Sequence, residues 1–200
     1  MTFKHQLSVG AAGESVVGAY CQSRGYIVQP VYEKFDQDRK GPRLFGGKRL
    51  YVAPDAMIIR YKGSGTPKVL YIEVKTKTYW TYHGKSGQFQ TGIDYHHCQE
   101  YQAVQHDTGI PVKLLFFHTS NVARRDDVAK WGCPDMIEDG SGLFLGDLSG
   151  IARTDNIPRG HAIKGMAYWN KTSLKRIATM QELKQAAVQF NLSWPYRETA

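Results

Sequence analysis

Three residues in the first half of the chain have types and spacing that suit metal-assisted chemistry. Asp55 follows Pro54, and Glu73 and Lys75 come eighteen and twenty residues later with a single valine between them. Two carboxylates and an ammonium group held close together can surround one divalent metal ion. Such a site hydrolyses phosphodiesters, because the metal ion polarises the phosphoryl oxygen and acidifies a bound water.

Two predicted strands would position these groups. Residues 54–61 and 68–75 are rich in apolar and β-branched side chains, and the segment between them contains two glycines and a proline, which indicates a turn. Because side chains alternate along a strand, Glu73 and Lys75 face the same side, whereas apolar neighbours face the other. A charged pair in so apolar a strand conflicts with a buried sheet, and such conflicts are expected at functional sites.

A helix that precedes these strands carries a third carboxylate. Residues 8–24 are predicted to be helical, with Ser8 as a cap and Gly25 as the terminator. Glu14 lies at the edge of the apolar stripe of this helix. Its neighbours at helical spacing are small or apolar and would let the helix approach a sheet closely: Gly10, Val17, Gly18 and Cys21.

The rest of the first half completes an α/β pattern. Residues 26–31 are predicted to be a first strand, 94–106 a helix, and 112–118 a buried strand, whereas 76–90 is predicted to be a loop because it shows no clear periodicity. The order of helix, strands, helix and strand favours a mixed β-sheet flanked by helices.

The second half is predicted to be a β-rich elaboration. Thr179 and Glu182 form a capping-box pattern that opens a final helix through Phe190. No segment resembles a linker, so 1–200 is predicted to be one domain with a core over about 8–118 and a C-terminal elaboration over about 119–200. Three further strands are predicted in that elaboration: 143–148, 162–169 and 174–178.

The order of these elements and acidic residues over 8–118 resembles the PD-(D/E)xK nuclease superfamily, which has the restriction-endonuclease-like fold. Within it, the chain is most similar to the Holliday-junction-resolvase-like and related phage nucleases. The resemblance implies that Asp55 is the central metal ligand, that Glu73 is a second ligand, and that Glu14 completes or supports the metal site. It implies that Lys75 orients or activates the attacking water, with Mg²⁺ or Mn²⁺ as cofactor. The Gln-x-x-x-Tyr signature of the RecB-like branch is absent, because residues 97–101 read His-Cys-Gln-Glu-Tyr, although Gln99, Gln102 or Tyr101 could still face the scissile phosphate.

Each candidate residue also has a purely structural interpretation. Asp55 could be a turn residue at the start of a strand, and Glu73 and Lys75 could be a solvent-facing pair. Glu14 could be a surface charge at the edge of its helix.

The charge of the chain favours a polyanionic partner. The formal net charge is +8, and the segment 33–49 carries six basic residues against three acidic ones. The segment 159–176 is also basic and contains no acid. The aromatic side chains of 76–90 could stack on unpaired bases or pack within the loop. The predicted nucleic-acid contacts are Lys40, Arg43, Lys48, Arg49, Lys77, Tyr79, Trp80 and Lys85.

Several classes of protein are not indicated. No apolar run reaches the length of a membrane span, and the first residues lack the apolar core of a signal peptide. Three widely spaced cysteines argue against a disulfide framework, so we expect a reducing, cytoplasmic setting. His96, His97, Cys98 and Cys133 lack the usual spacing of zinc ligands, and residues 46–48 lack the context of a nucleotide-triphosphate loop.

The leading hypothesis is a metal-dependent deoxyribonuclease. A version selective for branched DNA such as junctions or flaps predicts a homodimer, because a symmetric junction would need two active sites related by a twofold axis. The alternatives are a catalytically inactive nucleic-acid-binding module of the same fold and an RNA-directed nuclease.

Overall fold

The computed structural model describes residues 3–31, 43–45, 49–61, 65–159, 162–194 and 196. Two predicted nucleic-acid contacts, Lys40 and Lys48, lie outside the described residues.

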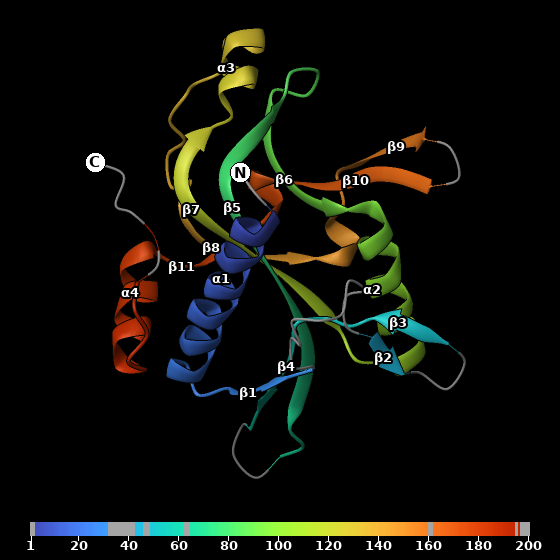
Figure 1. Ribbon diagram of the computed structural model, residues 1–200, viewed down its shortest axis with the longest axis vertical. Coiled ribbons are helices and arrows are strands. Elements are labelled where there is room, and N and C mark those ends of the chain that lie inside the picture. Colours follow the sequence, from blue (N-terminus) through green and yellow to red (C-terminus); the bar gives the residue numbers. More distant parts are fainter. Residues whose placement is uncertain are drawn as a thin grey trace.

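A mixed nine-stranded sheet forms the centre of the described structure (Figure 1). Its main path runs in the order β11-β8-β7-β5-β6-β10-β9, and β4 joins β5 while β1 joins β4. The strands are β1 (Ile27–Pro30), β4 (Ala56–Arg60), β5 (Lys68–His83), β6 (Gln88–Asp94), β7 (Val112–Ala123), β8 (Gly142–Asp147), β9 (Arg153–Arg159), β10 (Ala162–Asn170) and β11 (Lys175–Ala178). A separate hairpin pairs β2 (Arg43–Phe45) with β3 (Leu50–Val52).

Helices cover the sheet on both faces. They are α1 (Phe3–Ser23), α2 (Tyr95–Thr108), α3 (Arg125–Trp131) and α4 (Met180–Gln189). In Figure 1, α1 and α4 lie on one side of the sheet and α2 lies on the other. This arrangement confirms the predicted α/β class, a mixed sheet flanked by helices with a β-rich C-terminal part.

The two faces of β5 belong to two hydrophobic clusters, as alternation along a strand requires. Tyr71 packs in the cluster of the α2 face, with Tyr101 and Leu114. Ile72 and Val74 pack in the cluster of the α1 face. Glu73 and Lys75 therefore project toward the α2 face, on the same side of β5 as each other, as alternation predicted.

One edge of β5 changes partner part-way along the strand. β4 pairs with Lys68 to Ile72, and β6 pairs only with Thr81 to His83. The opposite edge pairs with β7 in parallel from Tyr71 to Trp80. Residues 73–80 of β5 thus have no strand partner on the β4 and β6 side within the described part of the chain. We call this opening, between the ends of β4 and β6, the strand fork.

The segment 76–90 is not a loop, so that prediction is wrong. β5 continues to His83, and β6 begins at Gln88 after a short turn in which Gly87 has a φ of +63°. The threonines and aromatic residues of this segment favour strands, and pairing with β7 outweighs their lack of periodicity. Strands β2, β3 and β9 and helix α3 were not predicted from the sequence.

Helix α1 approaches β5 most closely at Gly13. A Cβ atom on Gly13 would lie 1.9 Å from Thr76 Oγ1, whereas a Cβ on Gly10 or Gly18 would meet no atom within 4 Å. The predicted close approach therefore occurs, but it depends on Gly13 instead of the small residues that the sequence singled out. It places Glu14, the next residue, beside the fork.

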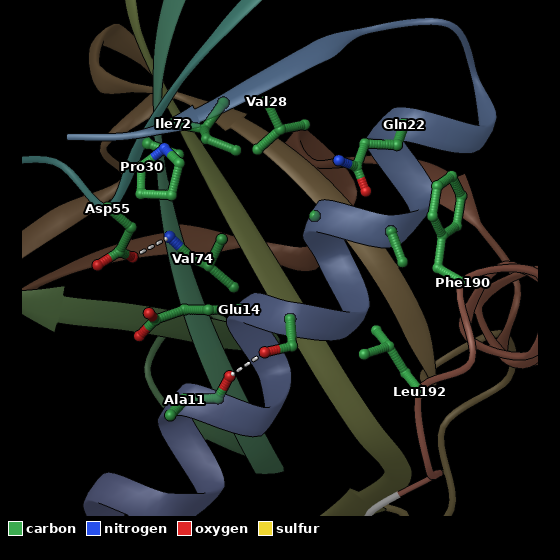
Figure 2. A pocket seen from close by; sticks show the side chains of 14 residues that line it. Ala11, Glu14, Gln22, Val28, Pro30, Asp55, Ile72, Val74, Phe190 and Leu192 are labelled. Carbon is green, nitrogen blue, oxygen red and sulfur yellow. Dashed lines mark hydrogen bonds between the residues drawn. The ribbon is translucent and has the colours of Figure 1, made fainter. Parts of the chain in front are cut away.

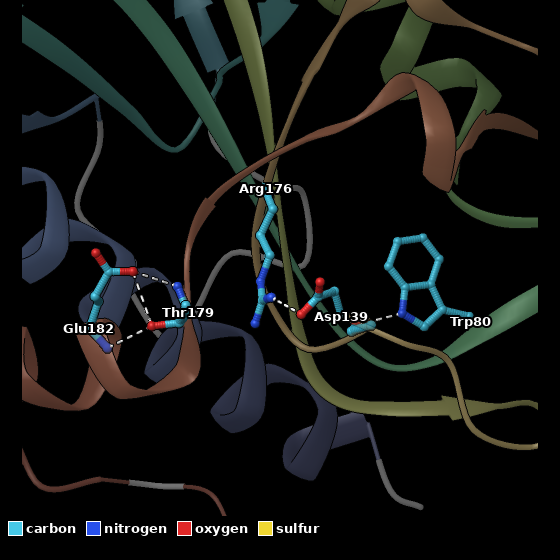
Figure 3. Close-up of polar contacts among 6 residues, drawn as sticks. Trp80, Asp139, Arg176, Thr179 and Glu182 are labelled. Atoms are coloured by element: carbon cyan, nitrogen blue, oxygen red, sulfur yellow. Dashed lines mark hydrogen bonds and ion pairs between the residues drawn. The ribbon is translucent and has the colours of Figure 1, made fainter.

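The C-terminal elements hold α1 and the loops around the sheet in place. The Tyr20 hydroxyl of α1 donates a hydrogen bond to the Ile177 carbonyl oxygen of β11 at 2.5 Å. The Arg176 guanidinium binds the Asp139 carboxylate at 2.5 Å (Figure 3). Figure 3 also shows the predicted capping box, in which Thr179 and Glu182 bond each other at the start of α4.

Candidate active site

Glu73 and Lys75 form an ion pair in the strand fork, in which Glu73 is buried and Lys75 is partly exposed. The Glu73 side chain is only 2% exposed, and its Oε1 accepts from Lys75 Nζ. Its Oε2 is buried without a hydrogen-bond partner among the described residues. Because a buried carboxylate oxygen normally has a partner, this atom is suited to bind a cation or a hydrogen-bond donor. A solvent-facing pair, the structural alternative for these residues, does not describe this burial.

Asp55 lies where β4 leaves β5. Its Oδ2 accepts a hydrogen bond of 2.8 Å from the Val74 backbone N–H, which has no strand partner on this edge (Figure 2). Because β4 no longer pairs with β5 at Val74, the Val74 N–H has no strand acceptor and donates to the Asp55 side chain instead. This bond fixes the Asp55 carboxylate next to the backbone of Glu73.

Glu14 reaches the same region from the α1 face. Glu14 and Asp55 both line a cavity of about 600 Å³ beside α1 and β1. Figure 2 shows the two carboxylates pointing to the same side of α1. Helix α1 and the start of β4 therefore bring Glu14 and Asp55 to one cavity, and Glu73, on the other face of β5, is not among the residues that line it.

The charged groups at this site shift one another's pKa values. Burial lowers the pKa of Lys75, but the carboxylates of Glu73, Asp55 and Glu14 outweigh burial, so the pKa is raised above its usual value. Burial and the Asp55 carboxylate raise the pKa of Glu73 to about 7, against the opposing effects of Lys75 and a Tyr101 hydrogen bond. The positive charge of Lys75 therefore offsets the effects of burial and of Asp55 on Glu73 only in part.

Helix α2 contributes Tyr101, one of the residues that the sequence suggested could face the phosphate, and His97, to which the sequence assigned no role. Tyr101 is buried and hydrogen-bonds Glu73. His97 lies one turn earlier, with its ring centroid 6.1 Å from that of Tyr101. Burial and Lys75 lower the pKa of His97, and its Nδ1 is buried without a hydrogen-bond partner among the described residues. His97 and Tyr101 are four residues apart and so lie on one face of the helix that follows the strand with Glu73 and Lys75. This spacing is the feature of the sequence that could have predicted their place at the site.

The acidic residues suit a hard divalent cation. Among the residues that the structure describes, no group of three or more His, Cys, Asp or Glu side chains is already arranged around one point. The buried Oε2 of Glu73 and the raised pKa of this carboxyl nevertheless fit a cation between Glu73 and Asp55. Mg²⁺ takes oxygen ligands and keeps several waters, so two carboxylates suffice to hold it.

The prediction that Trp80 contacts nucleic acid is wrong. The Trp80 side chain is fully buried, its ring stacks on His118 at 3.7 Å, and its N–H donates to the Gly140 carbonyl oxygen. β5 packs against β7 and the 137–140 segment, and this packing buries the ring. The lack of periodicity in 76–90 had instead predicted a loop for this residue.

The other predicted contacts differ in exposure. Tyr79 is 54% exposed, and Lys85 is exposed in the turn between β5 and β6. Lys77 is half-buried at the strand fork. Arg43 is exposed, whereas Arg49 is exposed but paired with Glu100 at 3.5 Å. Contact with nucleic acid stays a prediction for these five residues.

Comparisons with known proteins give a distant structural likeness. No family model matches the chain, and no curated protein matches its sequence. A solved structure with a similar chain path is a Holliday junction resolvase from the archaeal hyperthermophile Archaeoglobus fulgidus, with a TM-score of 0.45 and 9% identity. The match covers 88% of this chain and 99% of the resolvase.

In the described part of the chain, no helix is long and apolar enough to cross a membrane.

Proposed function

We propose that this chain is a divalent-metal-dependent nuclease that hydrolyses phosphodiester bonds of DNA at the strand fork. The observation that carries the proposal is the Glu73 carboxylate. It is buried on a central strand with one oxygen bound to Lys75 and the other without a partner among the described residues, beside Asp55. A protein gains no stability from such an arrangement, so a role in binding a cation explains it best.

Asp55 and Glu73 would hold the metal ion, and Glu14 would support it from α1. When bound, the ion would polarise the phosphoryl oxygen and acidify a water. Lys75 has a raised pKa and is therefore protonated at neutral pH. It would act as a cation that stabilises charge on the phosphate and orients water, instead of as a base.

The net charge of +8 favours a polyanion as substrate. DNA is the proposed polyanion, and branched DNA such as a junction or a flap is the proposed structural preference. RNA is the alternative substrate, and a binding module without turnover is the alternative function.

A cleavage assay tests the proposal. Linear duplex, single-stranded, flapped and four-way-junction DNA, with RNA of the same sequence, would be incubated with Mg²⁺, Mn²⁺ or EDTA. We expect metal-dependent cutting that Lys75→Ala and Asp55→Asn each reduce by about a hundredfold or more, the scale on which charge-stabilising catalytic groups act. Lys113→Ala is the matched control, because Lys113 lies on β7, at the edge of β5 opposite the fork, and pairs with Asp147 of β8. Binding without cutting would favour the inactive module, and cutting of RNA alone would favour the RNA-directed nuclease.

A further inference from the structure

The cavity beside α1 extends well beyond the two carboxylates that line it. Its volume of about 600 Å³ lies within the range of roughly 300–1,000 Å³ that is usual for ligand pockets. Glu14 and Asp55 line one end, and Figure 2 shows the side chains of Gln22 and Phe190 at the opposite end. A metal ion held by the carboxylates would use only the first end, so the rest of the cavity can take a further part of the substrate.

The walls of the cavity are apolar apart from a few side chains. Among the described residues that line it, none is a lysine, an arginine or a histidine, and the polar residues besides the two carboxylates are Ser15 and Gln22. The Ser15 hydroxyl already donates to the Ala11 carbonyl oxygen at 3.0 Å. Walls of this kind exclude an anionic group and accept a neutral group with few polar atoms.

Two residues at the far end suit a planar ring with a polar edge. Phe190, directly after α4, lines the cavity and is 38% exposed. Nucleobases stack on aromatic side chains, because every base has a flat π-face. Gln22 lies in the last turn of α1, and no hydrogen bond joins its amide to another described residue. This amide can therefore both donate to and accept from the edge of a base.

A glycine lies between the two ends of the cavity. Gly18 is four residues from Glu14 and four from Gln22, so the three residues follow one another along one face of α1. All three line the cavity, and a Cβ atom on Gly18 would meet nothing within 4 Å. Glycine inside a helix costs stability relative to alanine. At this position it leaves room that a larger side chain would fill.

We propose that this cavity binds one unpaired nucleobase of the DNA strand that is cut, and we call it the base site. The nucleotide is the one joined to the phosphate at the metal, because Asp55 belongs both to the cavity and to the strand fork. A base paired within a duplex does not enter, so the cavity selects strands with an unpaired nucleotide. This inference rests on the proposed function and deepens it, because it names the part of the substrate that is recognised.

The affinities of two single strands test the base site. One is a labelled oligonucleotide, and the other has the same length and the same phosphates but carries abasic sugars. Fluorescence anisotropy in EDTA, which prevents metal-dependent cutting, measures both. We expect the parent to prefer the strand with bases by about tenfold, the scale of one base–aromatic stack. Equal affinity for the two strands would overturn the base site.

Filling the cavity should remove this preference. We expect Gly18→Leu to weaken binding of the strand with bases by about tenfold and to leave binding of the abasic strand unchanged. Gly10→Leu is the matched control, because a Cβ on Gly10 also meets nothing within 4 Å and Gly10 does not line the cavity. It should bind both strands as the parent does. A preference for bases that survives in Gly18→Leu would contradict the proposal.

A second variant removes the ring instead of filling the cavity. We expect Phe190→Ala to weaken binding of the strand with bases by about five- to tenfold, again without an effect on the abasic strand. Val188→Ala is its control, because Val188 is 74% exposed and does not line the cavity. Thermal melting by circular dichroism confirms that each variant is folded. Equal losses on both strands in Gly18→Leu and Phe190→Ala would show that neither residue acts on a base, and the base site would be withdrawn.

The cleavage assay separates failure of the base site from failure of the proposed function. A parent that cuts DNA with metal but shows no preference for bases keeps the nuclease and loses the base site. A parent whose preference depends on Gly18 and Phe190 but that cuts nothing loses the nuclease and keeps the base site. A fully paired blunt duplex completes the test: an equal loss of its affinity in Gly18→Leu would overturn the selection of unpaired nucleotides.

Discussion

At the residue scale, the buried Glu73 carboxylate has one oxygen without a hydrogen-bond partner among the described residues. Its burial and the neighbouring Asp55 both disfavour its charged form, and Lys75 compensates only in part. Removing a partner from such a group is costly, whereas adding a cation relieves it.

We therefore expect Mg²⁺ to stabilise the protein against thermal unfolding. At a metal concentration one hundred times the dissociation constant, the gain is about 2.7 kcal/mol. Glu73→Gln should abolish the metal-dependent shift in melting temperature, because a neutral amide binds Mg²⁺ weakly. Glu138→Gln changes an exposed glutamate by the same atoms and should keep the shift. An undiminished shift in Glu73→Gln would place the metal elsewhere.

His118 gives a pH-dependent contribution to stability. Burial, with a smaller effect of Lys77, lowers its pKa from 6.5 to about 3. Both ring nitrogens are buried without hydrogen-bond partners among the described residues, so the folded state keeps the imidazole neutral. The unfolded state binds a proton below pH 6.5, and stability is therefore lost as the pH falls from that value toward 3.

We expect this effect to cost about 2 kcal/mol of unfolding free energy between pH 7 and pH 5. Urea unfolding of the parent and of His118→Phe at several pH values measures it, and the difference between the two profiles isolates His118 from Glu73, whose raised pKa acts in the opposite direction. His96→Asn, at an exposed histidine, is the control. Parallel profiles for parent and His118→Phe would contradict the assignment.

At the element scale, the contact of α1 with β5 sets the place of Glu14. The Cβ that alanine would add at Gly13 meets Thr76 and the Tyr196 hydroxyl, whereas the same change at Gly10 meets nothing within 4 Å. The two positions lie on one helix and differ in what they face.

We expect Gly13→Ala to destabilise the protein by about 1–3 kcal/mol, because α1 must move away from the sheet. Gly10→Ala should stabilise it by about 0.5–1 kcal/mol, because alanine favours a helix interior. Chemical denaturation of both variants measures the contrast. Similar stabilities would show that α1 does not depend on contact at Gly13.

The same elements show what could be predicted from the sequence. Alternation along an apolar strand correctly placed Glu73 and Lys75 on one face, and the capping box at Thr179 correctly placed α4. These are local patterns with a fixed period. The role of 76–90 as strand, the burial of Trp80 and the approach of His97 to the fork depend on which segments pair, and local propensity does not determine pairing.

At the scale of the whole molecule, the proposed preference for branched DNA requires two forks that act together. A symmetric four-way junction is cut at two related positions, which a twofold dimer would supply. If junctions are the preferred substrate, we expect the protein to sediment as a dimer at the concentrations that cut junctions. Preferred cutting of junctions by a protein that stays monomeric in analytical ultracentrifugation would contradict this expectation.

The hydrogen bond between Tyr20 and Ile177 joins residues 157 positions apart in the chain. Helix α1 also packs against α4, so the helix that carries Glu14 obtains much of its support from the last elements of the described chain. Contacts between such distant segments form late in folding, because closing a long loop costs conformational entropy before the contact contributes any favourable free energy. During synthesis on a ribosome, the strands with Asp55 and Glu73 would emerge long before the elements that hold Glu14. A nascent chain would therefore carry an incomplete fork until α4 has been made, and any cutting activity would appear only in the finished protein.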